Sequence, residues 1–209
     1  MRIGIIGSGK VGSTLADALV HRGNDVMLGT RDETRLSVRE FVETSGERGS
    51  AGSYTEAARF GDIVITAYPG RLVEETVAAI GPENLRGKVV IDAVNPVSVI
   101  DGAMVAAYGE NDSAAEVLQR AVPDARVVKA LNTEFAPRMI DPDPADGPTT
   151  MPIAGDDADA KAEVAALLGS IGWQVSDRGG LDRARELEHE MIARIVEMSS
   201  KRTGGGSAS

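Results

Sequence analysis

The chain has 209 residues, of which 42% are apolar and 26% are charged, and its formal net charge is −10 at pH 7. This balance is ordinary for a globular domain with a full core and disfavours a nucleic-acid or anionic-membrane surface, and the absence of cysteine excludes disulfides and thiolate chemistry. No apolar run approaches the ~18 residues of a membrane-spanning helix. The apolar part of the opening "MRIGIIGSGK" is too short for an export signal, so we expect a cytoplasmic protein.

The first 30 residues predict a strand, a glycine turn, a helix and a second strand. "MRIGII" is apolar and glycines follow it directly. "GKVGSTLADALVHRG" then has apolar residues at helical spacing and ends on Gly23, where a helix would stop. "NDVMLGT" is typical of a second buried strand. Together these segments predict a βαβ unit.

The alternation of strands and helices continues along the chain. It predicts helices over 33–44, 55–60, 71–80, 112–121 and 157–171, and strands over 62–68, 87–96, 125–133, 150–155 and 173–179. Residues 97–111 are expected to form a long connection, and the Pro- and Asp-rich segment 136–150 a loop over the active-site edge. The fold class is therefore α/β, a Rossmann-type doubly wound, mainly parallel sheet with a small helical C-terminal part. We expect a Rossmann domain over 1–180, a helix over 181–200 and a flexible tail over 201–209.

The glycine turn indicates a dinucleotide ligand. It matches G-x-G-x-x-G directly after the first strand and at the start of a helix, with Gly7, Ser8, Gly9, Lys10, Val11 and Gly12. Gly7 would make the tight turn, Gly9 would let a pyrophosphate approach the backbone, and Gly12 would let helix and strand pack closely. The helix N-terminus would supply free N–H groups for the phosphates.

The end of the second strand favours NADP over NAD. An acid usually stands there to accept hydrogen bonds from the adenine ribose, whereas this chain has Thr30 and Arg31. A guanidinium pairs with a 2′-phosphate, the hydroxyl adds a donor, and Arg35 lies one helical turn further on. Two alternatives remain open: Arg31 is a solvated surface arginine, or Asp32 contacts the ribose and weakens the preference.

Polar residues follow three other predicted strands, and in this fold ligands bind at the carboxyl ends of the strands. The candidates beside the ribose, the nicotinamide or a second ligand are Ala67, Tyr68, Pro69, Asn95, Pro96, Asn132 and Thr133. Each of them taken singly is also compatible with an ordinary strand exit or turn.

The sequence offers no convincing catalytic acid or base and no metal-binding cluster. His21 stands at a helix end, where a capping role is expected, and His189 lies between two glutamates on the last helix, where it is expected to be solvated. Lys129 falls within an apolar strand and needs a partner such as Asp92, in a structural or a functional role. We therefore assign no catalytic residue and expect transfer of hydride alone to a second redox cofactor.

The segments "IGIIGSGKVGSTLADALVHRGNDVMLGTRD", "VVIDAVNP", "RVVKALNT" and "PIAGDDADAKAEVAALLGSIGW" resemble, in this order, the NADPH-dependent coenzyme F420 reductases. The resemblance spans roughly residues 1–190. It implies reversible hydride transfer between NADP and the deazaflavin coenzyme F420, no side chain as proton donor, and often a homodimer. It also implies that Tyr68 and Pro69 flank the nicotinamide. Two further segments, Asn95 to Val97 and Asn132 to Thr133, would lie near the place where the nicotinamide and deazaflavin rings meet. The glycine turn is similar as well to the oxidoreductase domain of membrane ferric reductases and to pyrroline-5-carboxylate reductase.

Two further functions stay open at this point. One is an NADPH-dependent reductase of a flavin, an imine or another small acceptor. The other is an NADP-binding regulatory module without turnover. All three have small-molecule cofactors as partners and involve neither nucleic acid nor membrane. The amphipathic last helix is compatible with a homodimer and equally with packing inside one chain.

Overall fold

A computed structural model of the chain describes residues 1–147 and 149–204. Its centre is an eight-stranded sheet in the order β10-β9-β8-β5-β4-β1-β2-β3. The strands are β1 (Arg2–Ile6), β2 (Asp25–Gly29), β3 (Gly49–Gly52), β4 (Ile63–Thr66), β5 (Val89–Asp92), β8 (Arg126–Lys129), β9 (Thr150–Gly155) and β10 (Gln174–Asp177). From β3 to β8 all neighbours are parallel, whereas β9 is antiparallel to β8 and β10 is parallel to β9.

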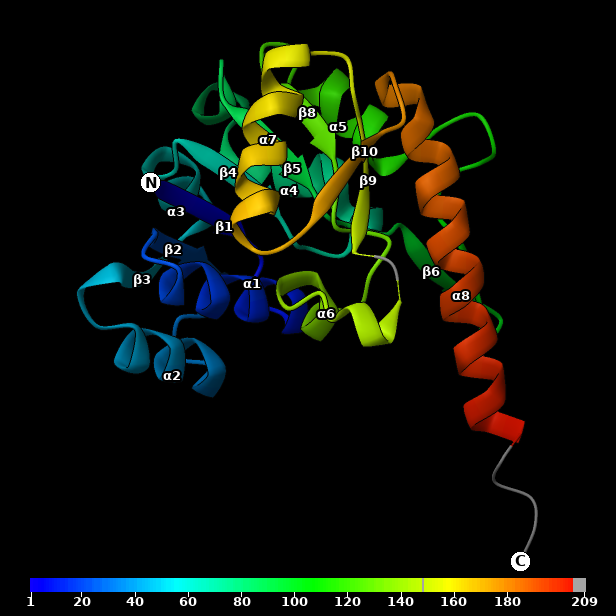
Figure 1. Cartoon of the computed structure of the whole chain (residues 1–209), viewed down its shortest axis with the longest axis horizontal. Helices are drawn as coiled ribbons and strands as arrows, with labels where there is room; N and C mark the ends of the chain where they lie inside the picture. The colour runs from blue at the N-terminus through cyan, green and yellow to red at the C-terminus, as the bar shows by residue number, and fades with distance from the viewer. Residues whose placement is uncertain (148, 205–209) are drawn as a thin grey trace, which may run out of the picture.

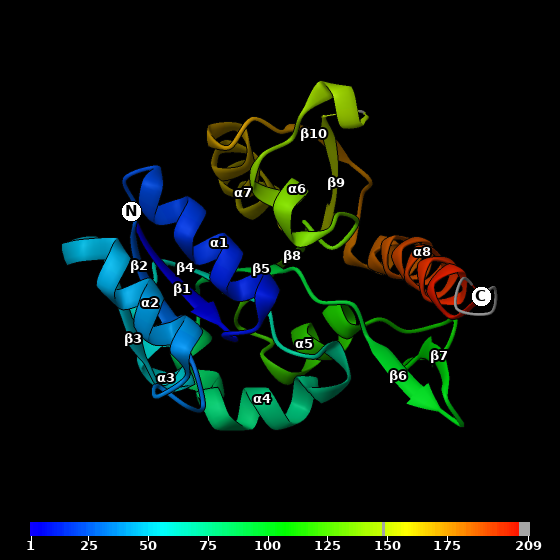
Figure 2. The same ribbon diagram turned by 90° about the horizontal axis from the view of Figure 1, so that it is seen from below.

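Helices cover both faces of this sheet, as Figure 2 shows from below. On one face pack α1 (Lys10–His21), α2 (Leu36–Ser45), α6 (Ala136–Ile140) and α7 (Ala158–Ser170). On the other pack α3 (Tyr54–Phe60), α4 (Val73–Ile80), α5 (Ala114–Ala121) and the first residues of α8 (Ala184–Gly204). The middle of α8 also packs on the molecule, with Leu187, Met191 and Ile192 buried, and only its C-terminal part extends away from the body (Figure 1). The doubly wound α/β class predicted from the sequence is therefore confirmed.

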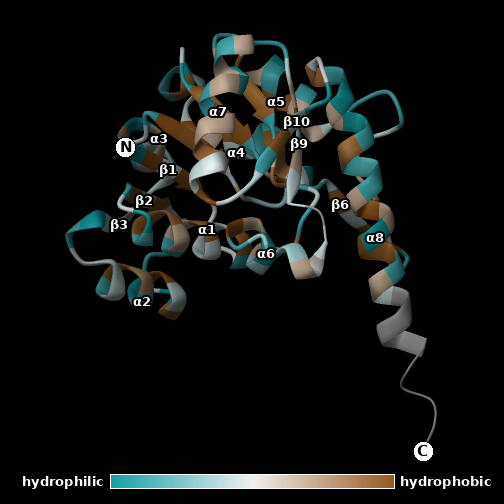
Figure 3. Cartoon of the chain, viewed as in Figure 1, coloured by the Kyte–Doolittle hydropathy of each residue, from teal (hydrophilic) through white to brown (hydrophobic). Residues whose placement is uncertain are grey.

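The central strands are apolar because both of their faces are covered. Every residue of β4 and β5 is buried, and so are the four residues of β1 after Arg2. Such continuous burial favours runs of Ile and Val over alternation. Figure 3 shows the resulting contrast between hydrophobic strands and more polar outer helices. From β1 the chain adds β2 and β3 on one side, and it then crosses to add β4 and β5 on the other side, so the strand order switches between β1 and β4. In this fold the ligand crevice lies at the carboxyl ends of the two strands at such a switch point.

The predicted connection over 97–111 contains a β-hairpin instead. Its strands are β6 (Val97–Ile100) and β7 (Ala103–Ala106), which pair antiparallel. The two turn residues, Asp101 and Gly102, have φ of 50° and 81°. Two positive φ values in a two-residue loop define the type I′ turn, for which Asp-Gly is a strong signal. The expectation of an irregular connection was wrong, because Asp101 and Gly102 supply the backbone conformation that lets the flanking residues pair as strands.

Two other segments differ from expectation. The short strand β3 has the sequence Gly-Ser-Ala-Gly and so has no apolar pattern to reveal it. The segment 136–150, predicted as a loop, begins with the helix α6, which packs on α1. This helix is also held by a hydrogen bond from the Trp173 indole N–H to the Met139 carbonyl oxygen, at 2.8 Å. At the C-terminus, α8 continues through Gly204, and the remainder of the predicted tail, 205–209, lies outside the described residues.

Candidate functional site

The glycine turn connects β1 to α1 at the crevice. Gly7 has a φ of 120°, and a Cβ atom there would lie 2.5 Å from the Ala67 carbonyl oxygen. A Cβ atom on Gly12 would collide with the Gly7 carbonyl oxygen. Gly9 is different, because a Cβ atom on it would meet no protein atom within 4 Å. The turn is thus closely packed at its first and third glycines and open at its second.

The Thr30 hydroxyl is used inside the protein. Its Oγ1 lies 2.8 Å from the Ser8 hydroxyl and accepts a hydrogen bond from the Asp32 backbone N–H at 3.1 Å. Thr30 is only 5% exposed. These bonds join the glycine turn to the loop after β2. Thr30 also lines the cavity described below, and its donation to a 2′-phosphate stays a prediction.

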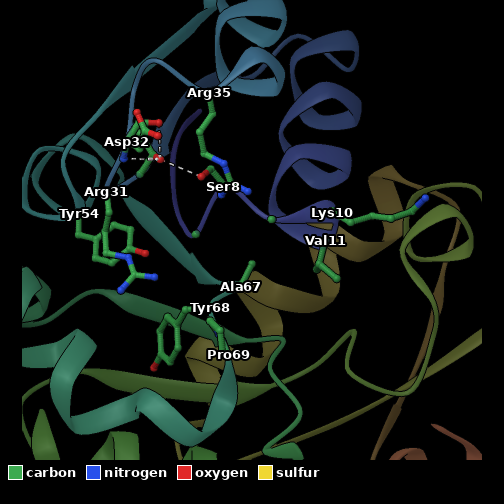
Figure 4. Close-up of a pocket in the computed structure, with 13 residues that line it drawn as sticks. Ser8, Lys10, Val11, Arg31, Asp32, Arg35, Tyr54, Ala67, Tyr68 and Pro69 are labelled. Carbon is green, nitrogen blue, oxygen red and sulfur yellow. Dashed lines mark hydrogen bonds between the residues drawn. The ribbon is translucent and has the colours of Figure 1, made fainter. Parts of the chain in front are cut away.

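Two arginines border the same crevice, and Figure 4 shows Arg31 extending into it while Arg35 points toward Ser8. No carboxylate in residues 1–147 or 149–204 forms an ion pair with either guanidinium. The Asp32 carboxylate accepts hydrogen bonds from the Thr34 hydroxyl at 2.6 Å and the Thr34 backbone N–H at 2.9 Å. These bonds lower the pKa of Asp32 and hold its carboxylate in the loop turn. The cations are available to an anion, whereas the acid already has partners.

The turn, the arginines and the exit of β4 enclose a cavity of about 500 Å³, which we call the glycine-turn cavity. It is lined by Gly7, Ser8, Gly9, Lys10, Val11, Thr30, Arg31, Asp32, Arg35, Tyr54, Ala67, Tyr68 and Pro69. Tyr54 was missed by the sequence analysis because it follows the glycine-rich β3. It lines the cavity together with Arg31, as Figure 4 shows.

A second, more apolar cavity of about 270 Å³ adjoins the first and shares Val11, Ala67 and Tyr68 with it. We call it the α8 cavity, because Met191 and Ile195 of α8 form one of its walls. The rest of its lining is Ala93, Val94, Asn95, Val97, Glu134, Phe135, Ala136 and Met139. Tyr68 lies between the two cavities, and burial, together with the charge of Asp92, raises the pKa of its hydroxyl well above the usual value.

Not every predicted residue reaches these cavities. Within the described part of the chain, Gly12, Pro96, Asn132 and Thr133 line neither of them. Asn132 is fully buried, and its amide donates to Asn95 Oδ1 at 3.1 Å and to the Leu187 carbonyl oxygen at 3.0 Å. Its predicted contact with a nicotinamide amide is therefore corrected: the side chain holds the exits of β5 and β8 to α8.

Lys129 has the buried acid partner that its position demands. Its ammonium donates to Asp92 at 2.8 Å, to Glu188 at 2.6 Å and to the Val94 carbonyl oxygen at 2.7 Å. Burial opposes the charge, but the two carboxylates hold the pKa of Lys129 above its ordinary value. The pairing with Asp92 was anticipated, whereas Glu188 came from a helix that no local pattern links to this strand.

The fold and the glycine turn define a dinucleotide-binding protein of the Rossmann type. Residues 2–96 match the model of the family described as "NADP oxidoreductase coenzyme F420-dependent". The chain is also 34% identical to a candidate F420-dependent NADP-reductase from Arthrobacter sp. FB24, with a TM-score of 0.87, over 98% of this chain and 95% of the other. The chain belongs to the family of coenzyme F420-dependent NADP oxidoreductases, and its class is that of an NADP-dependent oxidoreductase.

Other similar proteins have different descriptions. Metalloreductase STEAP3 of Rattus norvegicus is 30% identical over 190 residues, which are 90% of this chain but only 36% of that protein. A reductive aminase from Aspergillus terreus, solved in complex with NADPH, is 19% identical with a TM-score of 0.70 over 97% of this chain and 63% of the other, a likeness of fold alone. None of the helices in residues 1–147 and 149–204 combines the length and the hydropathy of a membrane-spanning segment.

Proposed function

We propose that the protein transfers a hydride reversibly between NADP(H) and the deazaflavin coenzyme F420. The observation that carries this proposal is the pair of adjoining cavities, one with a glycine turn and two arginines, the other largely apolar, which meet at Val11, Ala67 and Tyr68. A dinucleotide in the first would bring its nicotinamide to this junction. A planar acceptor in the second would face it. Family membership supports F420 as that acceptor.

The residues of the glycine-turn cavity suit the phosphates of NADP. The first N–H groups of α1 have no partner within the helix, and Gly9 leaves room for the pyrophosphate beside them. Arg31 and Arg35 would pair with the 2′-phosphate, and Arg31 and Tyr54 would flank the adenine. These two cations would meet the one phosphate that NADP has in addition to those of NAD.

The α8 cavity would orient the acceptor and exclude water from the transfer. When bound, NADPH would supply the hydride with its electron pair, and the one proton that the reduced deazaflavin also needs would come from bulk solvent and not from a side chain. Phe135, Met139 and Met191 provide apolar surface for a ring system. Alignment of two rings is then the main contribution of the protein to the rate.

The direct test is an assay of the purified protein with F420 and either NADPH or NADH, followed by the visible absorbance of F420. We expect NADPH to bleach the band. NADH should do so about 10- to 100-fold less efficiently, because one charge-assisted contact to the 2′-phosphate is missing. Persistence of the band under NADPH that is demonstrably bound would refute the acceptor and direct the search to flavins, imines or a regulatory role.

A pair of glycine substitutions tests where the pyrophosphate binds. Gly9→Ala should fold normally, with a loss of unfolding free energy below about 1 kcal/mol, because its Cβ meets no protein atom. Its Kd for NADPH should rise about tenfold or more, since that Cβ occupies the space assigned to the phosphates. Gly12→Ala should instead lose about 1–3 kcal/mol of stability, because its Cβ collides with the Gly7 carbonyl. Titration calorimetry and urea unfolding measure both, and unchanged NADPH affinity in Gly9→Ala would contradict the proposed site.

A further inference from the structure

Lys129 is the centre of a fully buried polar network behind the α8 cavity. Its side chain and that of Asp92 are 0% exposed, and Glu188 is 2% exposed. An ammonium has three N–H donors, and here the three acceptors are Asp92, Glu188 and the Val94 carbonyl oxygen. The lysine is therefore held in one position, without a spare donor.

The network joins five elements that are distant in the sequence. The second oxygen of Asp92, at the end of β5, accepts from the Thr66 hydroxyl at the end of β4, at 2.6 Å. Glu188 of α8 accepts from the backbone N–H groups of Ala114 and Ala115, at 3.0 and 3.4 Å. A carboxylate at this place also compensates the positive end of the α5 dipole. Lys129 itself ends β8, so β4, β5, β8, α5 and α8 all meet at these side chains.

The same contacts set the two walls of the α8 cavity. Val94, whose carbonyl oxygen is held by Lys129, lines one wall together with Asn95. Met191 and Ile195 line the same cavity, and they stand three and seven residues after Glu188, thus on the same face of α8. The position of these two side chains relative to Val94 and Asn95 therefore depends on the ion pair between Glu188 and Lys129.

The residues that follow β8 also fix the position of α8. Leu131 has a φ of 67°, a conformation that costs a leucine energy and persists only where neighbouring contacts impose it. The next residue, Asn132, donates to the Leu187 carbonyl oxygen of α8 and exchanges hydrogen bonds with Asn95. Helix α8 is thus attached to the strand exits at two adjacent positions, Leu187 and Glu188.

We infer that Glu188 is a positioning residue: through Lys129 it fixes the Val94–Asn95 backbone relative to Met191 and Ile195 and so shapes the cavity for a planar hydride acceptor. The role of the cavity as an acceptor site rests on the proposed function, whereas the shaping itself does not. The phosphate-binding parts of the glycine-turn cavity belong to β1, α1 and the loop after β2, which the network does not touch. Acceptor and NADPH affinities should consequently respond differently to its loss.

The test compares Glu188→Gln with Glu190→Gln, an exposed glutamate on the same helix. The glutamine oxygen can still accept a hydrogen bond from Lys129. Its amide NH₂ would then face the backbone N–H of Ala114, so that two donors meet and that hydrogen bond is lost. We expect kcat/KM for F420, per folded molecule, to fall roughly 10- to 100-fold because the rings are misaligned. The Kd for NADPH should change less than about twofold. Hydrogen exchange of peptides covering residues 93–97 should become faster in Glu188→Gln and stay unchanged in Glu190→Gln.

The outcomes separate this inference from the proposed function. If wild-type protein binds NADPH but does not reduce F420, the proposed acceptor is wrong, and the exchange of residues 93–97 still decides the positioning role. Unchanged exchange in Glu188→Gln overturns the inference. An equal loss of NADPH affinity and acceptor turnover, in proportion to a lower Tm, also overturns it, because that is the signature of a residue that only supports the fold.

Discussion

Lys129→Met is expected to lower the free energy of unfolding by about 3–5 kcal/mol, because it leaves Asp92 and Glu188 buried without their common cation. Each carboxylate keeps only hydroxyl or amide donors, which cannot compensate two desolvated charges. Since the pKa of Lys129 is raised in the folded protein, its contribution is complete at neutral pH and is lost only as the pH rises past the usual range of lysine. Urea unfolding at pH 7, followed by circular dichroism, measures the effect.

A matched control is Lys161→Met. Lys161 pairs with Asp177, which is exposed, at 2.8 Å, and loss of such a surface pair should cost at most about 1 kcal/mol. A triple variant with Asp92→Asn, Lys129→Met and Glu188→Gln should regain much of the lost stability, because no buried charge is then left unpaired. If Lys129→Met were no less stable than Lys161→Met, the network would not have the energetic role that its burial indicates.

The second large effect is expected in cofactor choice. Arg31→Ala should raise the Kd for NADPH about 10- to 100-fold, the equivalent of one charge-assisted contact of about 1.5–3 kcal/mol. The Kd for NADH should change little, because NADH has no 2′-phosphate. In the double variant Arg31→Ala/Arg35→Ala, the Kd for NADPH should approach the Kd for NADH. Quenching of protein fluorescence or titration calorimetry with both nucleotides measures this difference.

Arg39→Ala is the control for charge alone. Arg39 is exposed on α2, one turn beyond Arg35, and does not line the glycine-turn cavity. Its removal should leave the preference for NADPH intact. An equal loss of NADPH and NADH binding in Arg31→Ala would mean that this arginine contacts a part common to both nucleotides, and the assignment of the 2′-phosphate site would have to be abandoned.

Local features of the sequence determined the parts of this protein that depend on neighbouring residues. The glycine turn, the apolar strands and most helices follow from short patterns, because backbone conformation and burial on both faces of a parallel sheet constrain contiguous residues. The Asp101–Gly102 turn was equally local, and its hairpin was accessible to the same reasoning. Strand β3, in contrast, has the sequence Gly-Ser-Ala-Gly, which shows no apolar alternation, and it is recognised as a strand only by its pairing with β2.

Tertiary structure alone decided how the polar residues are divided between ligand and protein. Arg31 and Arg35 line the crevice, whereas Asn132, equally suited by type, is fully buried and used in internal hydrogen bonds. Glu188 reaches Lys129 across 59 residues of chain, and Met191 and Ile195 complete a cavity whose other wall is nearly 100 residues earlier. Sequence patterns report what a residue prefers, but a polar side chain has many acceptable partners, and the packing of distant elements chooses among them.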